Sequence, residues 1–238
     1  MYGERVFYGA AMPSLPPLFS GDLPDRDMWI DNHQVEFSPQ QWLQRLPEQW
    51  MFEDLAYLEP GDLMPWPTIS REFLFRLAAR LETPEDALRF YVAVCAWGAG
   101  PRAMLVSRRV RVLTGNKDPG ERLLAAIMMA RQEGAAPAYD SLRHGGKHRL
   151  THLGPGFFTK ILYLGAYDTT PGLKPLILDQ YVAAALREQT GLSGWTGWNW
   201  PTIEYEHYLT LADEWADAWG TTPDVVERML FEHGKDLD

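Results

Sequence analysis

The chain has 238 residues, of which 46% are hydrophobic and 13% are aromatic. This composition supports one large or two small domains with a hydrophobic core, and it excludes general disorder. The single cysteine, Cys95, excludes an internal disulfide framework and any four-cysteine zinc or iron–sulfur site. No apolar run approaches the roughly 18 residues of a membrane span, and the N-terminus does not resemble a secretory signal. We therefore expect a cytoplasmic protein that has no membrane partner.

The net charge of −10 argues against nucleic-acid binding until its distribution is considered. Residues 1–100 and 203–238 each carry a net charge of −8, whereas residues 101–202 carry +6. No acidic residue occurs between Ser141 and Tyr167. A locally basic surface on an acidic protein is typical of polyanion binding, although segregation of charge between solvated faces would give the same pattern. The run Ser107-Arg-Arg-Val-Arg111 permits both interpretations.

Residues 1–68 are rich in proline and aromatic residues, and proline interrupts regular elements because it removes a backbone donor. We expect this irregular segment to wrap around a domain, with one short helix over residues 39–46 that is capped by Ser38. From residue 69 to 238 the hydrophobic spacing is helical. The predicted helices cover residues 70–81, 84–98, 102–113, 121–132, 157–167, 180–189, 203–219 and 223–233. The fold class predicted is an all-α bundle of about eight to ten helices.

A hairpin over residues 152–160 carries the clearest chemical signal. Gly154-Pro155-Gly156 predicts a tight turn that aims backbone N–H groups outward, and the helix that begins near Phe157 adds a positive dipole end, so this corner can bind phosphate. Lys160 follows among apolar residues. Burial and the helix N-terminus both disfavour its charged form, and a neutral amine is a nucleophile. The simpler alternative is a surface lysine with a snorkelling stem.

Asp179 closes an apolar run and begins the helix over residues 180–189. Its simplest role is that of an N-cap. The run from Leu153 to Asp179 resembles the helix-hairpin-helix DNA glycosylase superfamily, and specifically its 8-oxoguanine glycosylase branch with compact all-helical members. That branch has a Pro-Gly-x-Gly-Thr-Lys hairpin, a short apolar helix, and an aspartate nineteen residues after the lysine. Here Pro155-Gly-Phe-Phe-Thr-Lys160 is followed by Asp179 at that spacing. The sequence departs from the pattern at Phe158, which replaces a glycine, and at Tyr181, where the branch often has histidine.

The resemblance implies a DNA glycosylase, which flips a modified base out of double-stranded DNA and cleaves its N-glycosidic bond to leave an abasic site. Lys160 would be the attacking amine and Asp179 the essential carboxylate, and an imine intermediate could permit β-lyase activity. No cofactor is implied, and a monomer associated with the nucleoid through DNA binding is expected. The predicted DNA contacts are Gly154, Gly156, Phe158, Thr159, Arg143, Lys147, His148, Arg149 and His152.

Three tryptophans lie within residues 195–200, and flat indoles stack on bases and pack against sugar rings. They could equally be core residues or loop anchors. The predicted base pocket contains Leu164, Tyr181, Trp198, Trp200, Tyr208 and Trp215. A roomy aromatic pocket favours a bulky hypermodified base of phage DNA, such as glucosylated hydroxymethylcytosine, which would indicate antiviral defence. The family resemblance favours oxidised guanine, and the sequence does not separate these two targets.

The sequence also permits other functional interpretations. His144, His148 and His152 have helical spacing, but glycines 145 and 146 interrupt that helix and no carboxylate lies nearby, so no metal site is predicted. The alternative from another class is a non-catalytic helix-hairpin-helix DNA-binding or adaptor protein, which would bind DNA without forming an abasic product. A helical protein-interaction domain would show no salt-dependent DNA affinity at all.

Overall fold

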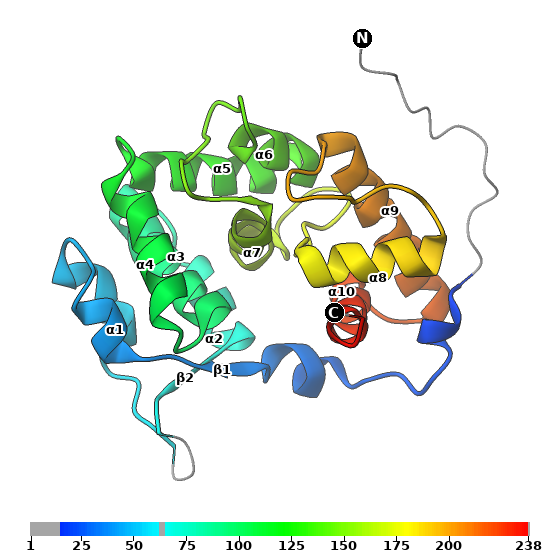
Figure 1. The fold of residues 1–238 in the computed structure, drawn as a ribbon, viewed down its shortest axis with the longest axis horizontal. Coiled ribbons are helices and arrows are strands. Elements are labelled where there is room, and N and C mark those ends of the chain that lie inside the picture. The colour runs from blue at the N-terminus through cyan, green and yellow to red at the C-terminus, as the bar shows by residue number, and fades with distance from the viewer. Residues whose placement is uncertain (1–14, 62–64, 238) are drawn as a thin grey trace.

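A computed structural model describes residues 15–61 and 65–237; the parts of the predicted N-terminal segment at residues 1–14 and 62–64 lie outside the described residues. Helices dominate this part of the chain, which confirms the all-α prediction (Figure 1). The α-helices are α1 (Pro39–Leu43), α2 (Arg71–Ala78), α3 (Pro84–Ala99), α4 (Ala103–Thr114), α5 (Pro119–Glu133), α6 (Ala135–Leu142), α7 (Pro155–Ala166), α8 (Gln180–Thr190), α9 (Thr202–Trp219) and α10 (Pro223–Lys235).

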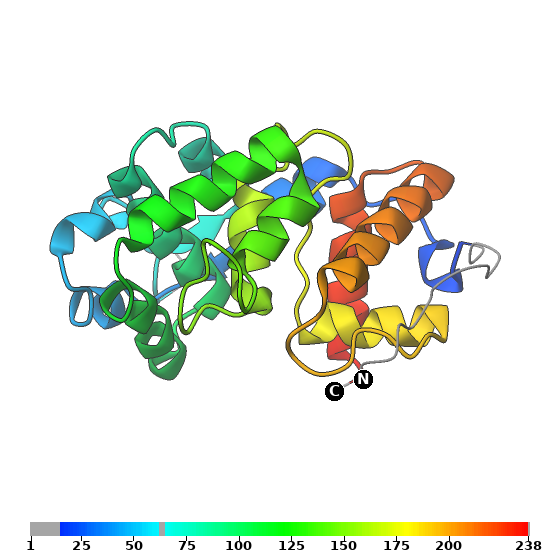
Figure 2. The same cartoon turned by 90° about the horizontal axis from the view of Figure 1, so that it is seen from above.

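The helices are arranged in two lobes (Figure 2). The first lobe contains α1–α7 and the second contains α8–α10. The connection over residues 167–179 and the N-terminal segment both pass between them, and α6 also packs against α9. The chain that leaves α7 therefore crosses the junction of the lobes and brings the start of α8 back beside α7, where a side chain from each can meet.

Local sequence signals explain where several helices begin. Thr83 and Asp86 form a reciprocal capping box at α3, and Ser38 and Ser70 accept backbone N–H groups at the starts of α1 and α2. The helix predicted over residues 102–113 is confirmed as α4. One helix was missed: α6 follows Gly134 directly and has no side-chain cap, so its short sequence carries no start signal.

The N-terminal segment is less irregular than its proline content predicts. It contains 3-10 helices over Pro17–Phe19 and Gln49–Leu55, a π-helix over Asp27–Asp31, and strand β1 (Gln34–Glu36). β1 pairs antiparallel with β2 (Thr68–Ser70), so that Val35 opposes Ile69. Three-residue strands are too short to show an alternating pattern, which explains why the sequence did not predict this sheet.

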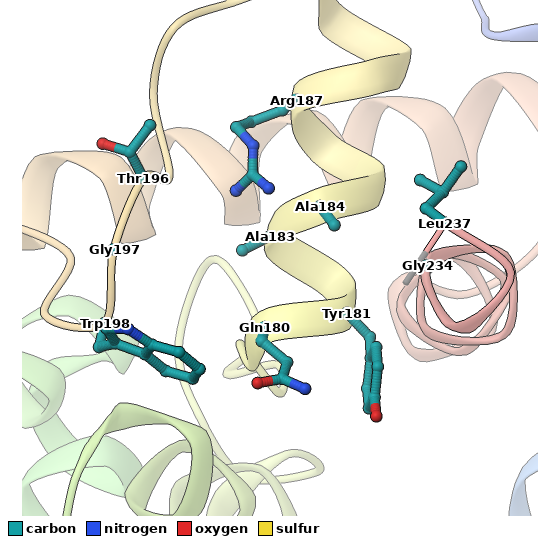
Figure 3. A pocket seen from close by; sticks show the side chains of 10 residues that line it. All are labelled: Gln180, Tyr181, Ala183, Ala184, Arg187, Thr196, Gly197, Trp198, Gly234 and Leu237. Atoms are coloured by element: carbon teal, nitrogen blue, oxygen red, sulfur yellow. The ribbon is translucent and has the colours of Figure 1, made fainter.

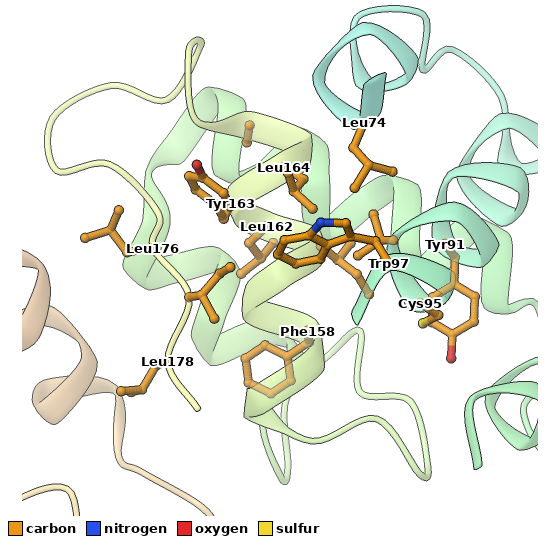
Figure 4. Packing of buried hydrophobic residues seen from close by; sticks show 14 of the residues in the cluster. Leu74, Tyr91, Cys95, Trp97, Phe158, Leu162, Tyr163, Leu164, Leu176 and Leu178 are labelled. Atoms are coloured by element: carbon orange, nitrogen blue, oxygen red, sulfur yellow. The ribbon is translucent and has the colours of Figure 1, made fainter. Parts of the chain in front are cut away.

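The core of the first lobe surrounds α7, which is apolar on nearly every side (Figure 4). Phe158, Leu162 and Leu164 pack there among residues of α2 and α3 and of the extended chain that precedes α8. A helix that is buried all round is held by packing rather than by its own propensity. α7 is thus a fixed support for the one lysine that it carries. No helix among the described residues is both long enough and apolar enough to cross a lipid bilayer.

Candidate active site at the junction of the lobes

Lys160 and Asp179 meet across the junction of the lobes. Nζ of Lys160 lies 2.9 Å from Oδ2 of Asp179, and the two side chains are only 10% and 16% exposed. The lysine stem passes close to Gly98 of α3, where an added Cβ would lie 3.3 Å from Cδ of Lys160 and 3.1 Å from the Phe157 ring. The sequence spacing therefore brings together the two groups that the family resemblance singled out, at an edge that solvent still reaches.

Asp179 has a second role through its other oxygen. Oδ1 accepts hydrogen bonds from the backbone N–H groups of Tyr181 (3.2 Å) and Val182 (3.3 Å), so Asp179 is the N-cap of α8. The cap fixes the rotation of the carboxylate, because one oxygen is tied to the helix while the other faces Nζ. The simple interpretation of Asp179 as a cap is correct, and it is compatible with a chemical role.

Thr159 sets the position of the chain that carries Asp179. Its hydroxyl donates to the carbonyl of Pro155 (2.6 Å) and accepts the N–H of Leu178 (3.1 Å). The prediction that Thr159 contacts DNA is wrong because this side chain is fully buried. The predicted contact through the Phe158 side chain is wrong for the same reason, whereas the His148 side chain is largely buried but still reaches the surface. The Phe158 ring packs against Tyr139, with centroids 5.0 Å apart, and burial lowers the pKa of His148.

A second ion pair, which the sequence did not predict, lies behind the first. The Arg71 guanidinium of α2 bonds to the Glu227 carboxylate of α10 at 3.1 Å and to the Tyr163 hydroxyl at 3.1 Å. Tyr163 in turn donates to Asp224 at 3.2 Å, and Arg26 of the N-terminal segment donates to the same carboxylate at 2.7 Å. This buried network joins α2, α7, α10 and the N-terminal segment.

The electrostatics of Glu227 connect the network to the Lys160–Asp179 pair. Burial raises the pKa of Glu227, the charges of Arg71 and Lys160 lower it, and the charge of Asp179 raises it. Burial by itself lowers the pKa of Arg71. The contacts of the guanidinium with Tyr163 and Glu227 outweigh burial, so the pKa of Arg71 lies above its ordinary value. No local pattern marks these residues, because 156 positions separate Arg71 from Glu227.

Two cavities are lined by residues that neighbour Lys160 and Asp179 along the chain, although neither side chain of the pair lines these two cavities itself. The α8 cavity, of about 500 Å³, begins at Gln180 and Tyr181 and runs along α8 to Arg187 (Figure 3). The hairpin cavity, of about 390 Å³, is lined by Arg143, Arg149, His152, Gly154 and further residues of the hairpin. Trp198 lines both cavities and is 73% exposed. Each member of the pair therefore has an open space within a few residues along the chain.

The base pocket predicted from the aromatic residues is largely wrong. The side chains of Leu164, Trp200, Tyr208 and Trp215 are at most 2% exposed and belong to the hydrophobic core. The Tyr208 hydroxyl serves the fold as well, since it donates to the carbonyl of Ile177 at 3.1 Å. Tyr181 and Trp198 are the two members of the set that line a cavity.

The remaining residues predicted to contact DNA gather around the hairpin. Lys147, Arg149, His152 and Gly154 are exposed, whereas Gly156 is partly buried. Arg143 is also partly buried and bonds to Asp140 and Thr202, both at 3.2 Å. α7 begins at Pro155 rather than near Phe157, which brings the positive end of its dipole closer to Gly154. The arrangement can hold phosphate groups next to the Lys160–Asp179 pair. The described residues contain no group of three or more His, Cys, Asp or Glu side chains that could hold a metal ion.

Comparison with known proteins identifies one family. The family model described as "Putative 8-oxoguanine DNA glycosylase OGG-like protein" matches residues 28–231, which include the hairpin, Lys160, Asp179 and the buried network from residue 71 onward. Neither the curated proteins nor the solved structures contain a match to this chain.

Proposed function

Since the chain belongs to the 8-oxoguanine DNA glycosylase OGG-like family, a family of DNA glycosylases, we propose that it removes a modified base from double-stranded DNA with Lys160 as nucleophile and Asp179 as the essential carboxylate. The observation that carries the proposal is the 2.9 Å contact between Nζ and Oδ2, at the partly exposed junction of two lobes. A lysine held by a buried helix and a carboxylate whose rotation is fixed by a helix cap form a preorganised pair.

The proposed reaction begins when the target nucleotide is flipped out, because its sugar carbon cannot be reached inside the stacked duplex. Lys160 forms an ion pair with Asp179 before DNA binds, and a charged ammonium group is not a nucleophile. Nζ therefore releases a proton to solvent before it attacks. The neutral amine then forms a bond to C1′ while the N-glycosidic bond breaks. The base leaves with the bonding electrons and takes up the proton that the new C1′–N group releases. Asp179 stabilises the positive charge that develops on the sugar.

The product of this step has two fates. Opening of the sugar ring gives an imine, and water hydrolyses it to an abasic site and free Lys160. Alternatively, loss of a proton from C2′ expels the 3′ phosphate by β-elimination and cleaves the strand, which is the proposed lyase activity. The hairpin residues Gly154, Gly156, Lys147, Arg149 and His152 would hold the DNA backbone during either course.

Two target bases are proposed, oxidised guanine and a bulky hypermodified base such as glucosylated hydroxymethylcytosine. The family supports the first, and the open α8 cavity beside Tyr181 supports the second. Duplex oligonucleotides that carry each base are incubated with the protein and then heated in alkali, which cleaves abasic sites. We expect cleavage of at least one duplex by the wild-type protein and none by Lys160→Gln. If neither duplex is cleaved, both proposed targets are wrong.

A further inference from the structure

Three cavities follow one another across both lobes and are linked by shared residues. A cavity of about 140 Å³, here named the α4 cavity, is lined by Arg108, Arg109, Arg111 and His152. His152 also lines the hairpin cavity, and Trp198 links the hairpin cavity to the α8 cavity. Through these shared lining residues the three cavities lie in series from α4, past the starts of α7 and α8, to Arg187, and we call this series the track.

The charge of the track differs from that of the rest of the molecule. No acidic residue lines any of its three cavities, although the chain carries a net charge of −10. Within residues 15–61 and 65–237, neither Arg149 nor Arg187 forms an ion pair with a carboxylate, whereas Arg71, Arg76 and Arg89 each do. Arginines that face a cavity without an acidic partner favour an anionic ligand.

Trp198 stands at the centre of the track on a loop that is fixed at both ends. Trp195 is fully buried and donates its indole N–H to the carbonyl of Glu204 at 2.9 Å, and Trp200 is buried in the core. Gly197, with φ of +74°, permits the turn between these anchors. Figure 3 shows the Trp198 indole beside Gln180, at the end of α8 that follows Asp179. The fold buries two indoles and exposes the third.

We propose that this track is the path of the target DNA strand, and that Trp198 stacks on a nucleotide base next to the position from which the target base is flipped. The inference rests on the proposed function and extends it beyond the hairpin to α4 and α8. A cationic groove interrupted by an aromatic platform is the arrangement that binds a locally unpaired strand, because arginines follow the phosphates while the ring stacks on a base.

This role differs from the one predicted from the sequence, in which Trp198 forms part of a pocket around the flipped base. A ring that is 73% exposed encloses little by itself. Stacking by an exposed indole stabilises a complex most when its partner is a nucleotide base that has lost its own stacking neighbour. Base flipping creates such a partner within the duplex, next to the Lys160–Asp179 pair.

The experiment uses the full chain and a duplex that contains a tetrahydrofuran abasic analogue, which has no base to remove. 2-Aminopurine is placed in turn opposite the analogue and on its 5′ and 3′ sides. We expect the wild-type protein to change 2-aminopurine fluorescence at one of these positions, and Trp198→Ala to abolish that change and weaken binding about tenfold or more. Trp198→Phe should retain most of the signal, and Trp66→Ala, an exposed tryptophan outside the track, should behave as wild type.

The far end of the track is tested by salt dependence. The double variant Arg108→Gln/Arg111→Gln should lower the slope of log Kd against log salt by up to about two, because each lost phosphate contact removes about one released ion. Arg76→Gln/Arg80→Gln makes the same charge change on α2 and just after its end, outside the track, and should leave the slope unchanged. If Trp198→Ala and the α4 double variant both bind the duplex as wild type does, the inference is overturned while abasic-site formation can still stand. If the wild-type protein binds no duplex, both fail.

Discussion

Within residues 15–61 and 65–237, two ion pairs link the lobes by joining a cation on α2 or α7 to a carboxylate on α10 or at the start of α8. The side chains of Arg71 and Glu227 are 2% and 1% exposed, and their network extends through Tyr163 to Asp224. Lys160 and Asp179 are less buried, and Asp179 is held by a helix cap instead of a second cation. The inner pair is enclosed and ties the lobes together, whereas the outer pair stays partly accessible to solvent, which the proposed reaction requires.

Replacement of the Asp179 charge should have the largest effect on activity. Asp179→Asn keeps a side chain that caps helices well but removes the negative charge that faces Nζ. We expect the rate of base excision to fall by a factor of about 10³, comparable to the loss of one preorganised electrostatic group, while the melting temperature changes little. Single-turnover kinetics and thermal unfolding provide the two measurements.

The control for that prediction separates the cap from the charge. Asp179→Ala removes both, so it should also lower the free energy of unfolding by about 1 kcal/mol. If Asp179→Asn excises the base at the wild-type rate, Asp179 is only a cap and the outer pair has no chemical role.

Removal of the inner carboxylate should have the largest effect on stability. Glu227→Ala leaves the Arg71 charge buried without its carboxylate, and breaking a buried pair in this way typically costs about 3–5 kcal/mol of the free energy of unfolding. Urea denaturation measures the loss. Arg76→Ala, which breaks the exposed Glu72–Arg76 pair at 2.8 Å, should cost no more than about 0.5 kcal/mol. Equal losses in the two variants would remove the distinction between inner and exposed pairs.

Thr159→Val should lower the free energy of unfolding by less than Glu227→Ala does, and the rate of base excision by less than Asp179→Asn does. Valine has nearly the same shape, but it leaves the N–H of Leu178 without the hydroxyl that it now bonds at 3.1 Å. An unsatisfied buried donor costs about 1–3 kcal/mol. Because Leu178 immediately precedes Asp179, we also expect a lower excision rate. Thr159→Ser, which restores the hydroxyl, should recover most of that rate; a Val variant with full rate would show that Asp179 is positioned by its cap alone.

Gly98→Ala should have the smallest effect on stability and still slow the reaction. The added methyl group would lie 3.3 Å from the Lys160 stem and 3.1 Å from the Phe157 ring, so one of them must shift. Alanine also favours the helix by up to about 1 kcal/mol, which offsets part of the strain. Gly21→Ala, whose methyl group meets nothing within 4 Å, is the control. Unchanged excision by Gly98→Ala would mean that the reaction tolerates displacement of the lysine.

The elements that the sequence predicted best are those set by local chemistry. The cap at Ser38, the cap at Asp179 and the nineteen-residue spacing from Lys160 to Asp179 all depend on residues of one segment of the chain, and the structure has each of them. The lysine was recognisable because a cation within an apolar helix is unusual.

The elements that the sequence missed depend on contacts between distant segments. Nothing local distinguishes Arg71 or Glu227 from the solvated charges of an amphipathic helix, since their burial comes from the packing of α2 against α7 and of both α2 and α10 against the N-terminal segment. The three tryptophans of residues 195–200 look alike in the sequence, and only the anchors at Glu204 and in the core decide which indole is exposed. Helix α6 has no side-chain cap and no long periodic pattern, so its packing against α5, α7 and α9 defines it.

The nucleophile at the outer pair can be tested by trapping the imine with borohydride. The protein is incubated with a duplex that carries its target base, reduced with sodium borohydride, digested and sequenced by mass spectrometry. The account predicts a covalent adduct of the deoxyribose on Lys160, with none in Lys160→Gln. An adduct on another residue, or undiminished trapping of Lys160→Gln, would contradict it.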